Sequence, residues 1–281
     1  MAGRVAMTAA VVRWWRMGTS IQAAVHREGI YGGQVKHALI AALMLVLVAC
    51  SHEPPPYESK YTPPPQSRPT QVAIIGDSFT AGTDLGGQGH RSWAYVMDKQ
   101  LRKAGVADLA ERIGAQGASG YTSKGNRDGK RFIDQVPDTV SRTTRLVIVF
   151  GSRNDRHYPA EQVQRDIKQT FAAVKAVAPD AMMLVIGPTW TDPEPSPTLD
   201  AVRAVLRDES AAVGATWVDP VVEGWFVDRP DLIGSDGVHP TDAGHVYLAE
   251  KIGPLVAGVL NPAPPCTTAA PFGHKQVNCP S

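Results

Sequence analysis

Residues 145–155 read RLVIVFGSRND, an apolar run of strand length that ends at a glycine and a group of polar side chains. Such an uninterrupted run, rich in β-branched residues, is typical of a strand buried on both faces of a sheet. The long segment at 161–178 predicts a helix, and the apolar run at 182–186 predicts a second strand. Strands separated by a helix of this length pair in parallel, because the chain must cross over between them.

The same alternation continues on both sides of this unit. Strands are expected at 72–75 and 216–218, and helices at 93–104, 199–213 and 242–260, the last of them capped by Thr241. The pattern predicts an α/β fold, a three-layer α/β/α sandwich whose central sheet is mainly parallel.

The composition fits one globular domain with appended segments. The 281 residues are 43% hydrophobic, and 28 Lys and Arg face 27 Asp and Glu, which leaves a net charge of +1. A chain of this length can bury a sizeable core. The near-zero charge provides no basic surface of the kind that binds nucleic acid, so no nucleic acid is expected as a partner.

The N-terminal segment reads as an export signal. Residues 38–49 form an unbroken apolar run after Lys36, and this run is shorter than the roughly 20 residues that a helix needs to span a bilayer. The run ends in Leu47-Val48-Ala49-Cys50, which resembles the lipobox of bacterial lipoproteins. That resemblance implies that residues 1–49 are a leader and that Cys50 is acylated. Translation could begin at Met1, Met17 or Val35.

A lipidated cysteine sets the expected location of the protein. We expect the chain to be exported and anchored through Cys50 to the outer face of the bacterial cytoplasmic membrane, with secretion as the alternative. Residues 50–70 are rich in proline and predict an extended tether between the lipid and a domain at 71–261.

The tail at 262–281 contains the other two cysteines, Cys266 and Cys279. In an exported chain whose Cys50 is consumed by lipid, we expect these two to form a disulfide. A zinc site built from them and His274 would lack a fourth ligand, so no metal is expected, and no cofactor either.

Four polar loops are expected to meet at one edge of the sheet, because ligand-binding loops follow the carboxyl ends of parallel strands. Ser78 follows the first predicted strand, and Asn154 follows the strand at 145–150. Gly120 lies in the third loop, and the segment Asp236-Gly237-Val238-His239-Pro240 forms the fourth.

These residue types meet the requirements of acyl transfer. The Ser78 hydroxyl would be the nucleophile and His239 the base that takes its proton. Asp236, three positions before His239, would hold the imidazole in the correct tautomer. The backbone N–H groups of Ser78 and Gly120, together with the Asn154 amide, would donate to the oxyanion.

The blocks that hold the nucleophile and the base resemble those of the SGNH, or GDSL-type, hydrolase family of esterases and lipases. Gly76-Asp77-Ser78 is similar to the nucleophile block of the family, with Phe79 where many members have leucine. Asp236 and His239 are similar to its Asp-x-x-His block. The likeness extends over 72–260.

The oxyanion blocks resemble the family with one departure. Gly120 corresponds to the oxyanion glycine of the family, and Asn154 to the asparagine of its Gly-x-Asn-Asp block. Here two residues, Ser152 and Arg153, separate Gly151 from Asn154, where the family has one. Because bulges that redirect a side chain are common beside active sites, we expect the loop to bulge and still deliver the Asn154 amide.

The resemblance implies a serine hydrolase that cleaves carboxylic esters, of an acyl lipid or an acylated glycan, through an acyl-serine intermediate. Two alternatives stay open. An envelope O-acyltransferase would use the same side chains with a sugar hydroxyl in place of water, and a non-catalytic lipoprotein would only bind glycan or lipid. The loop at 220–234, with Trp225 and Phe226, would either line an acyl pocket or cover the core.

Overall fold

The computed structural model describes residues 68–262. The expected leader with Cys50, nearly all of the tether, and the tail with Cys266 and Cys279 lie outside these residues. The described part contains a five-stranded sheet in the order β2-β1-β3-β4-β5, and every neighbouring pair of strands is parallel. The strands are β1 (Thr70–Gly76), β2 (Leu109–Ala115), β3 (Leu146–Phe150), β4 (Met182–Ile186) and β5 (Thr216–Val218).

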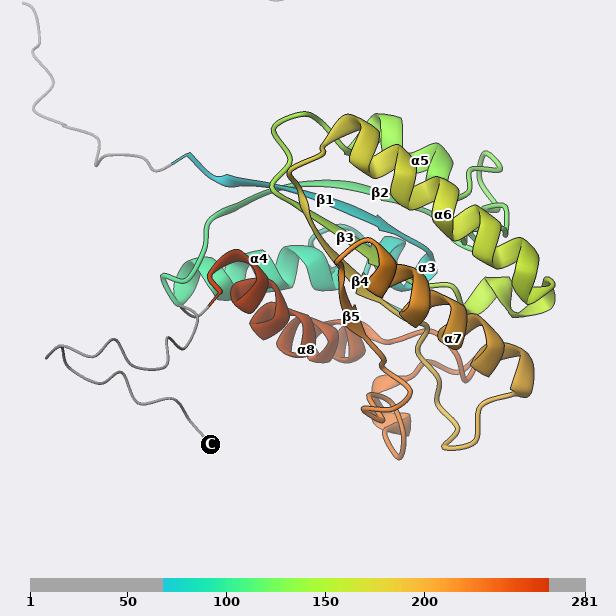
Figure 1. Ribbon diagram of the computed structural model, residues 1–281. Helices are drawn as coiled ribbons and strands as arrows, with labels where there is room; N and C mark the ends of the chain where they lie inside the picture. The colour runs from blue at the N-terminus through green and yellow to red at the C-terminus, as the bar shows by residue number, and fades with distance from the viewer. Residues whose placement is uncertain (1–67, 263–281) are drawn as a thin grey trace, which may run out of the picture. The chain divides into compact units, whose positions relative to one another are not determined.

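Helices cover both faces of this sheet (Figure 1). One face carries α4 (Trp93–Lys103) and α8 (Asp242–Leu260), and the other carries α5 (Phe132–Thr139), α6 (Ala160–Val177) and α7 (Pro197–Ala212). The predicted three-layer α/β/α sandwich is therefore confirmed. The predicted cap of the last helix is also present, because the Thr241 hydroxyl accepts the N–H of Gly244.

The two layers of core follow from the alternation of side chains along the strands. In β1, Val72 and Ile74 pack in the cluster that contains α4 and α8, whereas Ala73 and Ile75 pack in the cluster that contains α5, α6 and α7. All five residues of β3 are buried, so the strand has apolar contacts on both faces. This explains why its sequence is a continuous apolar run rather than an alternating one.

The sequence patterns did not predict β2 or α5. Strand β2 lies at the edge of the sheet, is mostly half-exposed and includes Glu111 and Arg112, so it has no apolar run. Helix α5 is short and contains Pro137, a residue that normally argues against a helix interior. Pairing with β1 and packing beside α6 hold these two elements in place.

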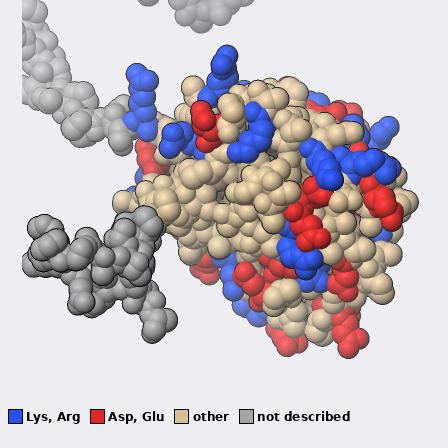
Figure 2. Space-filling view, viewed as in Figure 1, with Lys and Arg blue, Asp and Glu red and all other residues tan. Residues whose placement is uncertain are grey.

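Four short helical turns complete the described part: α3 (Ser78–Ala81), η1 (Gly89–Arg91), η2 (Arg153–His157) and η3 (Pro230–Leu232). On the face drawn in Figure 2, basic and acidic side chains are interspersed. Between residues 68 and 262, no helix combines the length and the apolar character that crossing a membrane requires.

Candidate active site

The end of β1 presents the predicted nucleophile. The chain leaves the strand at Gly76 and turns at once into α3, whose first residue is Ser78. Asp77 caps this helix, because its carboxylate accepts the N–H of Phe79 at 2.9 Å. The cap fixes the turn, and Ser78 is therefore held at the carboxyl edge of the sheet.

Ser78, His239 and Asp236 form one chain of hydrogen bonds. Nε2 of His239 lies 2.9 Å from Oγ of Ser78, and Nδ1 of His239 lies 2.5 Å from Oδ2 of Asp236. The arrangement places a proton on Nδ1 and leaves Nε2 to accept the serine proton, which is the geometry of a nucleophile, a base and an orienting carboxylate.

Asp236 is held in its charged form. Partial burial would raise its pKa, but the hydrogen bond from the His239 ring and the backbone N–H groups of His239 and Val238 outweigh it and lower the pKa of Asp236 to about 2. Both backbone groups donate to Oδ1 at 2.9 Å. One oxygen of the carboxylate therefore orders the turn, and the other orients the imidazole.

Aromatic side chains pack beside His239. The Phe79 ring lies 5.9 Å from the His239 ring, measured between centroids, and 6.2 Å from Phe150 and 6.4 Å from Phe226. Phe79 and Phe226 are both buried. The histidine therefore sits against a packed aromatic group on one side while Asp236 holds its far nitrogen.

The loop that carries Asn154 accommodates its extra residue through an unusual backbone. Gly151 has φ of +145° and Ser152 has φ of +89°, after which the chain enters η2. This turn lets Nδ2 of Asn154 donate to the carbonyl oxygen of Ser119 at 2.9 Å. An amide nitrogen has two hydrogens, so this contact leaves one available as an oxyanion donor.

Gly120 is next to this contact, but its N–H already has an acceptor. It donates to the carbonyl oxygen of Ser123 at 3.0 Å, so it could serve an oxyanion only by being shared. The N–H of Ser78 has no acceptor among residues 68–262. Of the predicted oxyanion donors, the Ser78 N–H and the Asn154 amide are thus the ones with free capacity.

Asp155 joins the loop that holds Gly120 to the loop that holds Asn154, a role that sequence reasoning did not assign. Its carboxylate is fully buried and accepts the backbone N–H groups of Tyr121, Thr122 and Ser123, each at 2.9 Å. It also accepts the Ser152 hydroxyl at 2.8 Å. Burial raises the pKa of Asp155, although these hydrogen bonds act in the opposite direction.

The glycines of the motif make room for buried carboxylates. A Cβ atom on Gly120 would lie 2.5 Å from Oδ1 of Asp155, and one on Gly151 would lie 2.6 Å from Oδ2 of Asp77. Both distances are far below a normal contact. These glycines are therefore required for close packing around the site.

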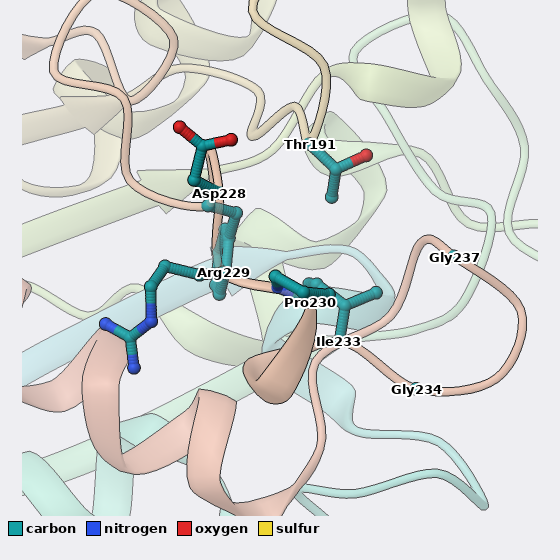
Figure 3. Close-up of a pocket in the computed structure, with 8 residues that line it drawn as sticks. Thr191, Asp228, Arg229, Pro230, Ile233, Gly234 and Gly237 are labelled. Carbon is teal, nitrogen blue, oxygen red and sulfur yellow. The ribbon is translucent and has the colours of Figure 1, made fainter.

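A cavity of about 380 Å³ adjoins the turn that holds Asp236. Figure 3 shows Thr191 facing it from one segment, while the chain from Asp228 to Gly237 provides the opposite wall. Its lining is Thr191, Phe226, Asp228, Arg229, Pro230, Ile233, Gly234 and Gly237. Because Gly234 and Gly237 flank Asp236 in the chain, the cavity lies beside the triad.

Of the two aromatic residues in the loop at 220–234, one lines the cavity and the other covers the core. Phe226 lines the cavity and contacts Phe79. Trp225 is 1% exposed, belongs to the core, and donates its ring N–H to Glu223 at 2.6 Å. In the part of the chain that the structure describes, no group of three or more His, Cys, Asp or Glu side chains could hold a metal ion.

Solved structures share this fold. A lipase/acylhydrolase from Enterococcus faecalis superposes with a TM-score of 0.56 at 14% identity, over 67% of this chain and 96% of that one. A family two carbohydrate esterase from Clostridium thermocellum, solved in complex with cellohexaose, gives a TM-score of 0.54 at 18% identity, over 71% of this chain and 66% of that one.

Sequence similarity identifies the family. The GDSL lipase Rv0518 of Mycobacterium tuberculosis is 45% identical over 190 residues, which are 66% of this chain and 81% of that protein. Residues 74–247 match the model of the GDSL-like lipase/acylhydrolase family. This range contains all three residues of the Ser78–His239–Asp236 chain. The protein therefore belongs to the GDSL-like lipase/acylhydrolase family, the SGNH serine hydrolases that act on esters.

Proposed function

We propose that this protein hydrolyses carboxylic esters at the cell envelope through an acyl intermediate on Ser78. The observation that carries the proposal is the unbroken hydrogen-bond chain from Ser78 through His239 to Asp236. A hydroxyl becomes a competent nucleophile only when a positioned base takes its proton, and this chain provides that base.

The first half of the reaction follows from the geometry. Nε2 of His239 takes the Ser78 proton while Oγ forms a bond to the ester carbonyl carbon. The negative charge that develops on the carbonyl oxygen is stabilised by the Ser78 N–H and the free amide hydrogen of Asn154. When the carbon–oxygen bond to the alcohol breaks, His239 protonates the departing alcohol oxygen, and the acyl group remains on Ser78.

The second half repeats these roles with water. His239 takes a proton from the water as its oxygen attacks the acyl carbon, and returns that proton to Oγ when the acid leaves. Asp236 stays ionised throughout, because its pKa of about 2 lies far below the working pH. Its charge stabilises the imidazolium that forms in each half.

The cavity supports an ester of moderate size, from an acyl lipid or an acylated glycan. A volume of about 380 Å³ is within the range of small-molecule sites. Phe226, Pro230 and Ile233 provide an apolar wall for an acyl chain, whereas Thr191, Asp228 and Arg229 provide polar groups for hydroxyls. The similar fold of the carbohydrate esterase supports an acylated glycan as the substrate.

The envelope location rests on the N-terminal sequence. The apolar run that ends in Leu47-Val48-Ala49-Cys50 supports export and lipidation at Cys50. The membrane would then be a partner through the lipid alone. If this is so, the Cys50→Ser variant will leave the detergent phase, or will accumulate unprocessed, when native protein is partitioned in detergent.

The activity is tested with p-nitrophenyl esters of graded chain length and with acetylated glycans. Wild-type protein should release product from at least one of them, and Ser78→Ala should release none while keeping its circular dichroism spectrum. A fluorophosphonate probe should add its mass to the wild type and not to Ser78→Ala. Turnover near the wild-type rate in the variant would rule out Ser78 as the nucleophile.

A further inference from the structure

Two arginines beside the oxyanion loop converge on one tryptophan. The Arg153 guanidinium carbon lies 3.7 Å from the ring centroid of Trp190, and that of Arg156 lies 5.8 Å from it. Nη1 of Arg156 donates to the Arg153 carbonyl oxygen at 2.8 Å, and Nη1 of Arg153 donates to the Thr189 carbonyl oxygen at 3.3 Å. The two positive charges are therefore held close together by the fold.

Within residues 68–262, no carboxylate is in ion-pair contact with either arginine. Neither Arg153 nor Arg156 forms a salt bridge there, and the hydrogen bonds above are the ones their side chains make. Burial, and next the charge of Arg156, lower the pKa of Arg153 to about 10, while the negative charges of Asp77 and Asp236 act against them. Burial and mutual repulsion therefore destabilise the charged form of Arg153, which has no ion-pair partner here.

The stacking geometry leaves these cations able to bind a ligand. A guanidinium has five N–H donors in its plane, and packing its face on an aromatic ring uses none of them. Arg153 uses a single donor group, Nη1, within the described residues. The remaining donors have the fork geometry that matches a carboxylate or a phosphate.

The pair adjoins the chain segments that form the candidate site. Arg153 directly precedes Asn154, and its guanidinium is close enough to Asp236 to be affected by the charge of that residue. On the other side, Trp190 is followed by Thr191, which lines the cavity next to the triad. The pair therefore neighbours in the chain both Asn154 and a residue that lines the cavity.

We propose that Arg153, stacked on Trp190, and Arg156 beside it form a subsite for an anionic group of the substrate, a carboxylate or a phosphate. The inference rests on the proposed esterase function, because it concerns the same site. It narrows the substrate class to esters that carry a negative charge near the scissile bond, such as acyl groups on acidic glycans or on phosphate-bearing alcohols.

The test compares matched neutral and charged esters with the full-length protein. One pair is p-nitrophenyl butyrate and p-nitrophenyl hemisuccinate, which places the charge on the acyl side. The other compares 4-acetoxyphenyl phosphate and 4-acetoxybenzoate with methyl 4-acetoxybenzoate, which places it on the alcohol side. The measured quantity is the ratio of kcat/KM for the charged ester to kcat/KM for the neutral one.

The wild type should favour at least one charged ester, and the double variant Arg153→Gln/Arg156→Gln should lower that ratio by about tenfold or more, as loss of a charge-assisted fork implies. Arg153→Lys keeps the charge without the fork and should lose less.

Arg142→Gln, at an exposed arginine before β3, is the control and should leave the ratio unchanged. An equal loss on neutral and charged esters would show that the pair only positions Asn154, and would overturn the proposal, as would an unchanged ratio.

Direct binding separates this proposal from the proposed function. Titration calorimetry with succinate and with phenyl phosphate should give binding to the wild type that the double variant loses. If no ester is turned over but this binding is present, the esterase proposal fails and the anion subsite stands. If esters are turned over but neither anion binds and no charged ester is preferred, the subsite proposal is wrong.

Discussion

The side chain of Asn154 donates to the carbonyl oxygen of Ser119 at 2.9 Å, although its loop is one residue longer than the Gly-x-Asn-Asp pattern. The extra residue is taken up by the left-handed backbone at Ser152, before the turn of η2 begins. The asparagine thus reaches the neighbouring oxyanion loop in spite of the insertion.

We predict that Asn154→Ala lowers kcat by at least about tenfold, and by up to about 1000-fold, at nearly constant KM. The reason is that the Gly120 N–H is already donated to Ser123, which leaves Asn154 and Ser78 as the free donors. Steady-state kinetics on any ester that is turned over will measure the effect. Asn126→Ala, at an exposed asparagine, is the matched control. A kcat within twofold of wild type would require an oxyanion hole without Asn154.

Asp155 should contribute more to stability than any exposed carboxylate of the domain. Replacing it with alanine leaves the buried N–H groups of Tyr121 and Thr122, and the partly buried one of Ser123, without their acceptor. Because each buried unpaired donor costs about 1–3 kcal/mol, we expect Asp155→Ala to lower the free energy of unfolding by about 3 kcal/mol or more. Urea denaturation measures this, and Asp180→Ala, at an exposed aspartate, should change it by less than about 0.5 kcal/mol. Equal values for the two variants would contradict the role of Asp155.

The triad was predictable from the sequence because its chemistry dictates residue types. A nucleophile, a base and an orienting carboxylate each have few candidates, and Ser78, His239 and Asp236 all follow predicted strands or precede a predicted helix. Asp155 was not predictable in the same way. Its function depends on donors from positions 121–123, more than 30 residues away in the chain, and no local pattern records that contact.

The strands also differ in whether the sequence predicts them. Strand β3 was predicted because burial on both faces imposes an apolar run, whereas β2 was not, because an edge strand can contain Glu111 and Arg112 without cost. No local sequence pattern predicts a shared partner for Arg153 and Arg156. Their contacts with Trp190 depend on the loop after β4, which the sequence does not place next to them.

At low pH, kcat/KM should fall because the active site takes up a single proton. The pKa of Asp236 is lowered to about 2, so the carboxylate stays ionised at every pH used for assay, and protonation of His239 alone removes the base. A plot of log kcat/KM against pH should therefore have a slope of about one below its plateau. Measurements from pH 4.5 to 8 will decide this. A slope of two would mean that a second group must also be deprotonated, and Asp77, whose pKa burial raises to about 7, is the candidate.

Asp236→Asn should retain more activity than Ser78→Ala. The asparagine can no longer stabilise the imidazolium, yet Ser78 and His239 remain, and a fraction of the molecules holds the correct tautomer. We expect the loss to fall mainly on kcat and to lessen as the pH is raised. Kinetics at pH 7 and pH 9 will test this, with Asp134→Asn, on the exposed surface of α5, as the control. Equal inactivity of both active-site variants at each pH would show that Asp236 does more than orient and stabilise the base.

The buried His245 should destabilise the fold in acid. Its Nδ1 accepts the Trp93 N–H at 3.2 Å, its Nε2 has no partner among residues 68–262, and burial lowers its pKa to about 4. Because an unfolded histidine titrates near 6.5, the unfolded chain binds a proton between these two values and the folded chain does not. The free energy of unfolding should therefore fall as the pH drops from about 6.5 to 4, by up to about 3 kcal/mol for this one group.

Asp77 and Glu111, whose pKa values burial raises to about 7, act in the opposite direction, so the comparison must be made against a variant. In His245→Asn the amide oxygen can still accept from Trp93 but takes up no proton, and urea denaturation at pH 7, 6, 5 and 4.5 should show the wild type losing stability relative to it. Two curves that stay parallel over this range would mean that His245 is protonated in the folded protein.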